Sequence, residues 1–209
     1  MDKINTLTLA ELKSAQSYSS LAEIFGIPQQ KLASSLYGKS RNYVSFEILK
    51  RGGGARLIDS PIGVCRIIQS LLAPLLASTY KATDSAHGFI RGRSIVSNAK
   101  MHVGKRTIIN IDIVDFFNTI SFKRIRGIFL AEPYRLTWAV ATILAQACCC
   151  EGRLPAGGIS SPTLSNIILS RLDKKFSMLI AKLGGVYTRY CDDLTFSFLI
   201  SPDAQPRVA

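Results

Sequence analysis

The stretch VYTRYCDDLTFSFLI, residues 186–200, carries the clearest structural pattern in the chain. Two apolar runs flank the adjacent carboxylates of Asp192 and Asp193, and this pattern predicts a β-hairpin with the acids at its tip. Aspartate is favoured in turns, so an acidic pair alone could be an ordinary solvated turn. Because the flanking residues are apolar, the tip is instead expected to emerge from buried strands.

A third acid, Asp112, lies in the run RTIINIDIV at residues 106–114. This run is rich in β-branched residues and predicts a buried strand. The isoleucines around Asp112 are expected to enclose it, and an enclosed charge needs a partner. The strand is expected to share one sheet with the hairpin, which would bring Asp112 beside the acidic pair.

Three acids that meet in this way predict a divalent metal site. Carboxylates repel one another, and such a cluster usually persists because a cation lies between them. Mg²⁺ is the natural candidate, because it takes few protein carboxylates, keeps several waters and accepts its other ligands from substrate phosphates. Two Mg²⁺ ions about 4 Å apart, with Mn²⁺ as a substitute, would polarise an attacking hydroxyl and stabilise a departing pyrophosphate.

The charge balance of the chain points to a polyanionic partner. Lysine and arginine total 26 against 14 aspartate and glutamate residues, which gives a formal net charge of +12. Nucleic acid is the commonest partner of so basic a protein, although a protein with a merely basic surface has the same composition. With 209 residues and 47% hydrophobic content, the chain can form one large domain or two small lobes.

The cysteines and the N-terminus exclude several classes of protein. There are five cysteines, an odd number, three of them adjacent at 148–150, and no CxxC spacing occurs. Neither a disulfide framework nor a zinc site is indicated, and reduced thiols are expected. The start MDKINTLTLAEL lacks a targeting pattern and no apolar run is long enough for a membrane span, so a cytoplasmic protein without a membrane partner is expected.

Helical and strand patterns alternate along the rest of the chain. The first 40 residues predict small helices, and residues 43–61 predict a β-hairpin with basic side chains near its turn. Further helices are predicted over 64–80, over 134–148, and from a start at Ser161 to Gly184. The expected fold is therefore of the mixed α+β class.

Several segments resemble, in order, the motifs of reverse transcriptases. They are RGGGARLIDSP at 51–61, NIDIVDFFNTI at 110–120, LPAGGISSPTLSNI at 154–167 and YCDD at 190–193. Within that family, HGFIRGRS at 87–94 and NAKMH at 98–102 resemble the retron branch. The resemblance covers roughly residues 20–198.

The resemblance implies the fingers and palm of a right-hand polymerase, with helices packed on an antiparallel palm sheet. The implied organisation is a helical lead-in at 1–40, fingers at 41–105 and a palm at 106–209, with segments of the fingers interleaved around 120–155. The chain ends shortly after the YCDD hairpin, so the duplex-holding thumb of such polymerases is expected to be missing.

The implied function is that of a retron-type reverse transcriptase, an RNA-directed DNA polymerase. It would copy a structured non-coding RNA template into DNA by two-metal-ion nucleotidyl transfer, with antiphage defence as its setting. Its implied partners are the template and primer, the RNA–DNA hybrid, deoxynucleoside triphosphates and an effector protein. Two alternatives remain open: a reverse transcriptase of the group II intron or diversity-generating type, and an inactive, truncated RNA-binding remnant.

The resemblance also assigns roles to individual residues. It makes Asp112, Asp192 and Asp193 the catalytic metal ligands, with the Ile113 carbonyl as a further ligand. Nucleotide binding falls to Arg56, Lys50, Arg51, Asp115, Phe117, Ala156 and Gly157, and template binding to Asn98, His102, Arg91 and Arg93. Phe117 stands where the family keeps a ring that excludes the ribose 2′-hydroxyl. Ala156 replaces a glutamine that lies near the nascent base pair, which implies altered efficiency or fidelity.

Plain structural explanations compete with some of these roles. Arg56 could be a solvated hairpin charge, and at least one of Phe116 and Phe117 should belong to the core. For His102 we favour a structural histidine with satisfied hydrogen bonds. His87 is likewise expected to form a hydrogen bond within the fingers.

Overall fold

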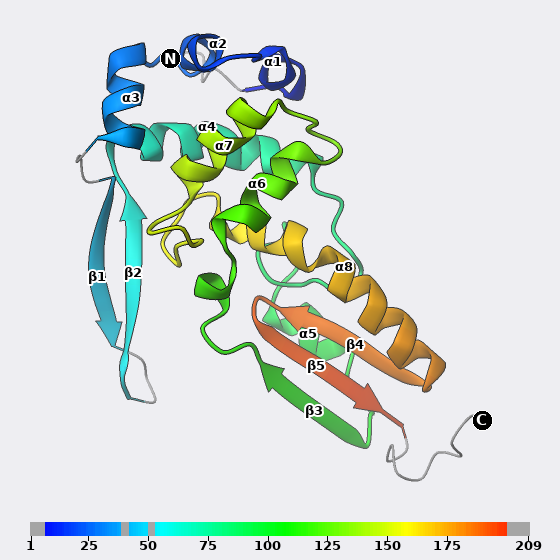
Figure 1. The fold of residues 1–209 in the computed structure, drawn as a ribbon. Coiled ribbons are helices and arrows are strands. Elements are labelled where there is room, and N and C mark those ends of the chain that lie inside the picture. Colours follow the sequence, from blue (N-terminus) through cyan, green and yellow to red (C-terminus); the bar gives the residue numbers. More distant parts are fainter. Residues whose placement is uncertain (1–6, 39–41, 50–52, 200–209) are drawn as a thin grey trace. The chain divides into compact units, whose positions relative to one another are not determined.

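The computed structural model describes residues 7–38, 42–49 and 53–199, which divide into two compact units. Unit 1 comprises Met1–Tyr80 and Phe117–Ser165, and unit 2 comprises Lys81–Phe116 and Asn166–Ala209. Helices and antiparallel sheets both occur, which confirms the predicted α+β class (Figure 1).

Unit 1 begins with the predicted small helices: α1 (Leu9–Ser14), α2 (Tyr18–Ile24) and α3 (Gln29–Tyr37). Capping boxes at Thr8 and Ser17 satisfy the first backbone N–H groups of α1 and α2. The predicted hairpin follows as β1 (Tyr43–Leu49) and β2 (Ala55–Pro61), which pair in antiparallel register along their full length.

The remaining helices of unit 1 are α4 (Gly63–Thr79), α6 (Phe122–Leu130) and α7 (Trp138–Cys148), and a 3₁₀ turn, η1 (Phe116–Thr119), precedes α6. The predicted start of α7 at residue 134 is wrong. Thr137 caps the helix by accepting from the Val140 N–H, whereas Tyr134 is buried in the preceding turn, where its hydroxyl shares a 2.7 Å hydrogen bond with Thr79.

Unit 2 contains a three-stranded antiparallel sheet in the order β3–β5–β4. Its strands are β3 (Thr107–Asp112), β4 (Gly185–Tyr190) and β5 (Asp193–Phe198), and its helices are α5 (Ile95–Lys100) and most of α8 (Ser161–Lys182). The single sheet predicted from the sequence is therefore confirmed.

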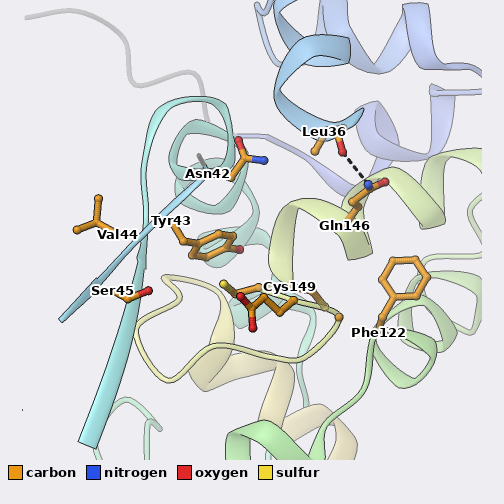
Figure 2. Close-up of a pocket in the computed structure, with 11 residues that line it drawn as sticks. Leu36, Asn42, Tyr43, Val44, Ser45, Phe122, Gln146 and Cys149 are labelled. Carbon is orange, nitrogen blue, oxygen red and sulfur yellow. Dashed lines mark hydrogen bonds between the residues drawn. The ribbon is translucent and has the colours of Figure 1, made fainter. Parts of the chain in front are cut away.

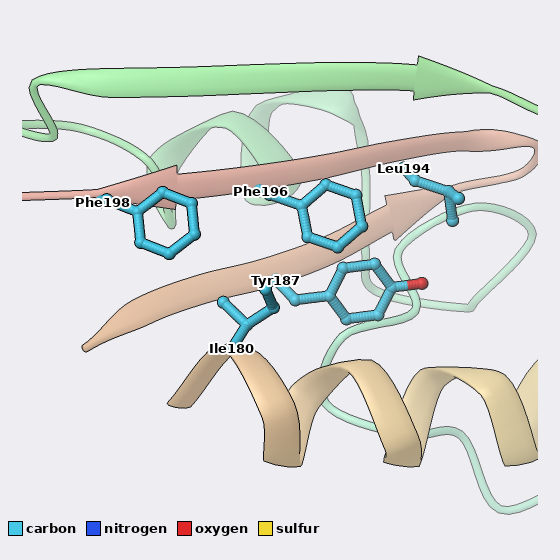
Figure 3. Packing of buried hydrophobic residues seen from close by; sticks show 5 residues of the cluster. All are labelled: Ile180, Tyr187, Leu194, Phe196 and Phe198. Carbon is cyan, nitrogen blue, oxygen red and sulfur yellow. The ribbon is translucent and has the colours of Figure 1, made fainter. Parts of the chain in front are cut away.

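A small hydrophobic core joins α8 to β4 and β5. Ile180 from the helix meets Tyr187, Leu194, Phe196 and Phe198 from the strands, and all five are buried (Figure 3). Phe176 of α8 adds its ring edge to the rings of Tyr187 and Phe196, with centroids 5.4 Å away in both cases. This packing fixes β4 and β5 against the helix.

The prediction that β3 is a buried strand is wrong. Ile108, Ile109 and Ile111 are 52%, 41% and 50% exposed, so the predicted enclosure of Asp112 by isoleucines is wrong as well. Within the described residues β3 pairs with β5 alone and forms an edge of the sheet. Ile113, just beyond the strand, packs partly against the core of unit 2. A β-branched run predicts a strand but not the number of its covered faces.

All five cysteines are free thiols, as predicted. Burial raises the pKa of Cys148 to about 12 and the pKa of Cys150 to about 11, so both are protonated at neutral pH. None of the described helices is both long and apolar enough to cross a membrane.

Candidate functional site

The sheet of unit 2 brings the predicted metal carboxylates together. In the β3–β5 ladder Asp112 lies directly opposite Asp193. Residues opposed in this way have Cβ atoms about 4.5–5.5 Å apart. Asp192 immediately precedes β5, in the turn that joins it to β4. The predicted meeting is therefore confirmed for Asp112 and Asp193, and an antiparallel register rather than enclosure produces it. The convergence of all three acids on a metal stays a prediction.

The turn of this hairpin contains only Cys191 and Asp192, because Tyr190 pairs with Asp193. Cys191 has φ +57°, in the left-handed region that side chains with a Cβ seldom adopt. Both turn carbonyls are held. The Ile113 N–H donates to the Asp192 carbonyl at 3.3 Å, and Arg189 Nη1 donates to the Cys191 carbonyl at 2.7 Å. An unfavourable backbone conformation persists where its surroundings over-determine it.

Gly88 lies flat against the turn. A Cβ at Gly88 would stand 2.3 Å from the Cys191 backbone nitrogen and 2.7 Å from the Cys191 sulfur. Only glycine therefore allows the backbone at residue 88 to approach Cys191 so closely. Through this contact the HGFIRGRS segment packs against the turn of the hairpin. The backbone at and just before this segment also bonds to β4: the His87 N–H donates to the Arg189 carbonyl, and the Arg189 N–H donates to the Ser85 carbonyl.

The acids interact electrostatically. Partial loss of hydration raises the pKa of Asp193, and the nearby charges of Asp192 and Asp112 raise it further. A cation bound among them would reverse these shifts. Among the described residues no three His, Cys, Asp or Glu side chains converge closely enough to hold a metal by themselves. Mg²⁺ suits such an open arrangement, because water and substrate phosphates complete its coordination.

The structure reveals two charged residues at this site that the sequence analysis did not identify, Arg189 and Asp173. Both side chains are fully buried and form an ion pair at 2.8 Å. A signal for Asp173 was present in the sequence, since it is the one acidic residue of α8. It shares the helix face of Leu169, Phe176 and Ile180, which is an otherwise apolar stripe.

In unit 1 the residues predicted to bind the nucleotide gather along β2. Arg56 is exposed on β2 opposite Ile48. Gly157 packs so tightly against the same strand that a Cβ would stand 2.7 Å from the Asp59 carbonyl oxygen, and Ala156 beside it is half-buried. Lys50 and Arg51 lie outside the described residues.

The segment after β3 carries the other predicted nucleotide contacts. Asp115 is exposed and has φ +50°. Phe116 is buried and Phe117 is half-buried, which confirms that at least one of the two rings belongs to the core. The sugar contact that the family resemblance implies for Phe117 stays a prediction.

The residues predicted to meet the template have unequal exposure. Arg91 is exposed and Asn98 is half-buried. Arg93 Nη1 donates to the carbonyls of Thr83, Asp84 and Ala86 at 2.6, 3.2 and 2.6 Å, so its guanidinium shapes its own loop.

His102 is buried, with Nδ1 2.6 Å from the Ser197 hydroxyl and Nε2 2.7 Å from the Thr188 hydroxyl. These contacts agree with the structural interpretation of this histidine. The expected hydrogen bond of His87 is confirmed, since its Nδ1 lies 2.8 Å from the Ser97 hydroxyl. Burial lowers the pKa of both histidines, and nearby cations lower it further.

A cavity of about 750 Å³ opens in unit 1 at the base of the β1–β2 hairpin (Figure 2). Tyr43, Val44 and Ser45 of β1 line it together with Phe122 and Gln146. Gln146 Nε2 donates to the Leu36 carbonyl at its edge. None of the predicted site residues that the structure describes lines this cavity.

Comparisons with known proteins bear directly on this site. Residues 48–202 match the family model of reverse transcriptases (RNA-dependent DNA polymerases). The retron Mx65 reverse transcriptase of Myxococcus xanthus is 37% identical over 175 residues, which cover 75% of this chain and 40% of the relative. The retron Mx162 reverse transcriptase of the same organism is 32% identical over 221 residues, covering 95% of this chain and 44% of the relative.

The retron Ec86 reverse transcriptase of Escherichia coli is 31% identical over 164 residues, covering 78% of this chain and 51% of the relative. The chain thus spans about half the length of these relatives, or somewhat less. The matched segment contains all the carboxylates of the site. The chain therefore belongs to the reverse transcriptase family and is of the retron type.

Proposed function

We propose that this chain carries the polymerase site of an RNA-directed DNA polymerase that copies a structured non-coding RNA into DNA. The observation that carries the proposal is the register of β3 on β5, which sets Asp112 opposite Asp193, the residue that follows Asp192 in the chain. On the family resemblance we assign the β3–β5–β4 sheet of unit 2 to the palm and the β1–β2 hairpin of unit 1 to the fingers.

In this proposal Asp112, Asp192 and Asp193 hold two Mg²⁺ ions, with the Ile113 carbonyl as a further ligand. The bound ions would polarise the primer 3′ hydroxyl and stabilise the departing pyrophosphate. The carboxylates act by holding a fixed geometry, because positioning and electrostatic stabilisation supply most of the catalysis in phosphoryl transfer.

The residues of unit 1 would select and bind the incoming nucleotide. Arg56 is exposed on β2 and free to donate charge-assisted hydrogen bonds to a triphosphate. Ala156 would leave space for a base pair because its side chain is a single methyl group, and Gly157 would position this loop by its close packing on β2. The Phe117 ring would exclude a ribose 2′-hydroxyl and so make deoxynucleotides the substrate.

The basic character of the chain supports an RNA template and an RNA–DNA hybrid as ligands. A formal charge of +12 attracts a phosphate backbone, and Arg91 is exposed in the HGFIRGRS loop. The retron type further suggests an effector protein and a role in antiphage defence, and we include both in the proposal.

A second candidate function is RNA binding without polymerisation. Ala156 favours it, because a side chain that normally lies beside the nascent base pair is absent.

Primer extension on an RNA template with Mg²⁺ separates the two candidates. The chain is compared with the variant Asp192→Ala, Asp193→Ala and with Glu132→Gln, which breaks an exposed ion pair to Arg135. Polymerisation predicts a loss of more than about a hundredfold in the double variant, since even the partners of metal ligands are worth that much, and no loss in Glu132→Gln. Equal background from the unaltered chain and the double variant would leave only RNA binding.

A further inference from the structure

One arginine connects the turn that bears Asp192 to the helix behind it. Arg189 Nε and Nη2 donate to the two carboxylate oxygens of Asp173 at 2.9 and 2.8 Å. This bidentate arrangement uses one edge of the guanidinium. The other edge faces the turn, where Nη1 donates to the Cys191 carbonyl at 2.7 Å and to Asn166 Oδ1 at 3.0 Å.

The partners of this arginine are themselves held. Asp173 also accepts hydrogen bonds from the Tyr187 hydroxyl at 2.9 Å and from the Thr83 hydroxyl at 3.3 Å. Asn166 Nδ2 donates to the Gly88 carbonyl at 3.0 Å, so the amide that meets Arg189 also fixes the glycine against Cys191. The network therefore reaches the turn through both Arg189 and Gly88.

Stability alone does not explain a buried ion pair at this place. Replacing such a pair by apolar residues of similar volume is often neutral or even stabilising, because the desolvation cost of the two charges is large. An apolar pair cannot, however, donate to the Cys191 carbonyl. Arginine alone offers a planar fork that binds a carboxylate with one edge and keeps a donor for a second acceptor.

The Cys191–Asp192 turn needs the hydrogen bond from Arg189 for two physical reasons. Cys191 has φ +57°, which the chain would relax if it could. In addition, Asp112 lies directly opposite Asp193 in the ladder, and like charges in opposed positions repel each other and favour separation. A Cys191 carbonyl that is held in place opposes both the relaxation of this backbone angle and the separation of the carboxylates.

We propose that Asp173 and Arg189 are positioning residues, and that their buried pair holds the Cys191–Asp192 turn in the geometry that the metal ligands require. This inference rests on the proposed function of the three carboxylates. Neither residue touches a metal or a substrate. Groups that orient metal ligands typically contribute about 10- to 100-fold to metal affinity or activity.

The variant Asp173→Leu, Arg189→Met tests the proposal, because it removes both charges and keeps an apolar core. Its melting temperature is expected to fall less than that of Asp173→Leu alone, because no charge is left buried without a partner, although Tyr187 and Asn166 each lose a hydrogen bond. Its Mn²⁺ affinity, measured by titration of the free-ion paramagnetic resonance signal, is expected to fall about 10- to 100-fold. The Mg²⁺ concentration for half-maximal primer extension is expected to rise by a similar factor. A residue that only stabilised the fold would change neither quantity in a folded variant.

Arg189→Lys provides a second variant that keeps the charge. A lysine can still meet Asp173, but its single nitrogen cannot also reach the Cys191 carbonyl. Metal affinity is therefore expected to fall by a smaller factor than in the double variant while the melting temperature is retained. The matched control, Glu132→Gln with Arg135→Met, breaks the exposed pair of unit 1 and should change neither quantity.

Unchanged Mn²⁺ affinity in a folded double variant would overturn the inference. The inference would also be wrong if the double variant loses both stability and Mn²⁺ affinity while Arg189→Lys retains full affinity. The pair would then be purely structural. Failure of the proposed function looks different: the unaltered chain and Asp192→Ala, Asp193→Ala would show equal primer extension, whatever their metal affinity. Absence of Mn²⁺ binding by the unaltered chain would contradict both the proposed function and this inference.

Discussion

The two β-hairpins of this chain are built in opposite ways. β1 and β2 form a ladder whose side chains are largely exposed. β4 and β5 are buried against α8, and their two-residue turn is held by Ile113, Gly88 and Arg189. The first hairpin presents side chains to a ligand, whereas the second fixes carboxylates relative to one another. We therefore expect changes in β4–β5 to alter metal binding, and to alter stability as well where a buried group is left without its partner. Changes in β1–β2 should alter ligand binding alone.

The largest expected effect comes from Asp173→Leu alone. This change leaves the Arg189 charge buried without its carboxylate, which typically costs about 3–5 kcal/mol. Thermal or denaturant unfolding of the variant measures the loss. An unfolding free energy equal to that of the unaltered chain would contradict the assignment of Arg189 and Asp173 as a coupled buried pair.

Gly88→Ala is the next most informative change. The new Cβ would stand 2.3 Å from the Cys191 nitrogen, so the turn must shift, at a cost of about 1–3 kcal/mol. Gly127→Ala in α6 is the matched control. Its Cβ meets nothing within 4 Å, and alanine in a helix interior should stabilise by about 0.5–1 kcal/mol. Destabilisation of equal size in both variants would remove the special role of close approach at Gly88.

Arg56→Ala tests the exposed hairpin. A lost charge-assisted hydrogen bond of about 1.5 kcal/mol should raise the KM for deoxynucleotides about tenfold. The melting temperature should hardly change, since an exposed substitution is usually worth less than about 0.5 kcal/mol. Steady-state kinetics with varied nucleotide give the result. A fall in kcat with unchanged KM would contradict a role of Arg56 in binding the triphosphate in the ground state.

The smallest expected effect is a pH dependence from the buried histidines. Burial lowers the folded-state pKa of His102 and His87, so the unfolded chain binds their protons first as the pH falls below about 6.5. The contribution of the two neutral histidines to the free energy of unfolding should be fully present above that pH. It should decline below it, as the pH falls toward the lowered folded-state pKa. Melting curves across this range should show a weaker decline for His102→Gln. An identical decline would assign the effect to other groups.

Local patterns explain why much of this structure was predictable. The hairpin at β4–β5 has apolar strands around an acidic turn, and α8 has clear start and stop residues, so sequence neighbours alone specify them. The start of α7 was misplaced because an apolar run hid the capping residue Thr137. The exposure of β3 depends on which strands and helices cover it, and no local pattern reports that.

The candidate site was likewise only partly predictable from the sequence. Asp112, Asp192 and Asp193 were found because acids in apolar surroundings stand out within a short window. Arg189 and Asp173 were missed because their meaning lies in a contact across 16 positions of sequence. Arg189 alone reads as a surface charge. The apolar stripe of α8 marks Asp173 as unusual, but only the packing of α8 on β4 identifies its partner.

Anomalous diffraction from crystals of this chain grown with Mn²⁺ would test the central claim most directly. We predict anomalous density between the side chains of Asp112 and Asp193, within coordination distance of Asp192. Density confined to other places, with these carboxylates turned apart, would contradict it.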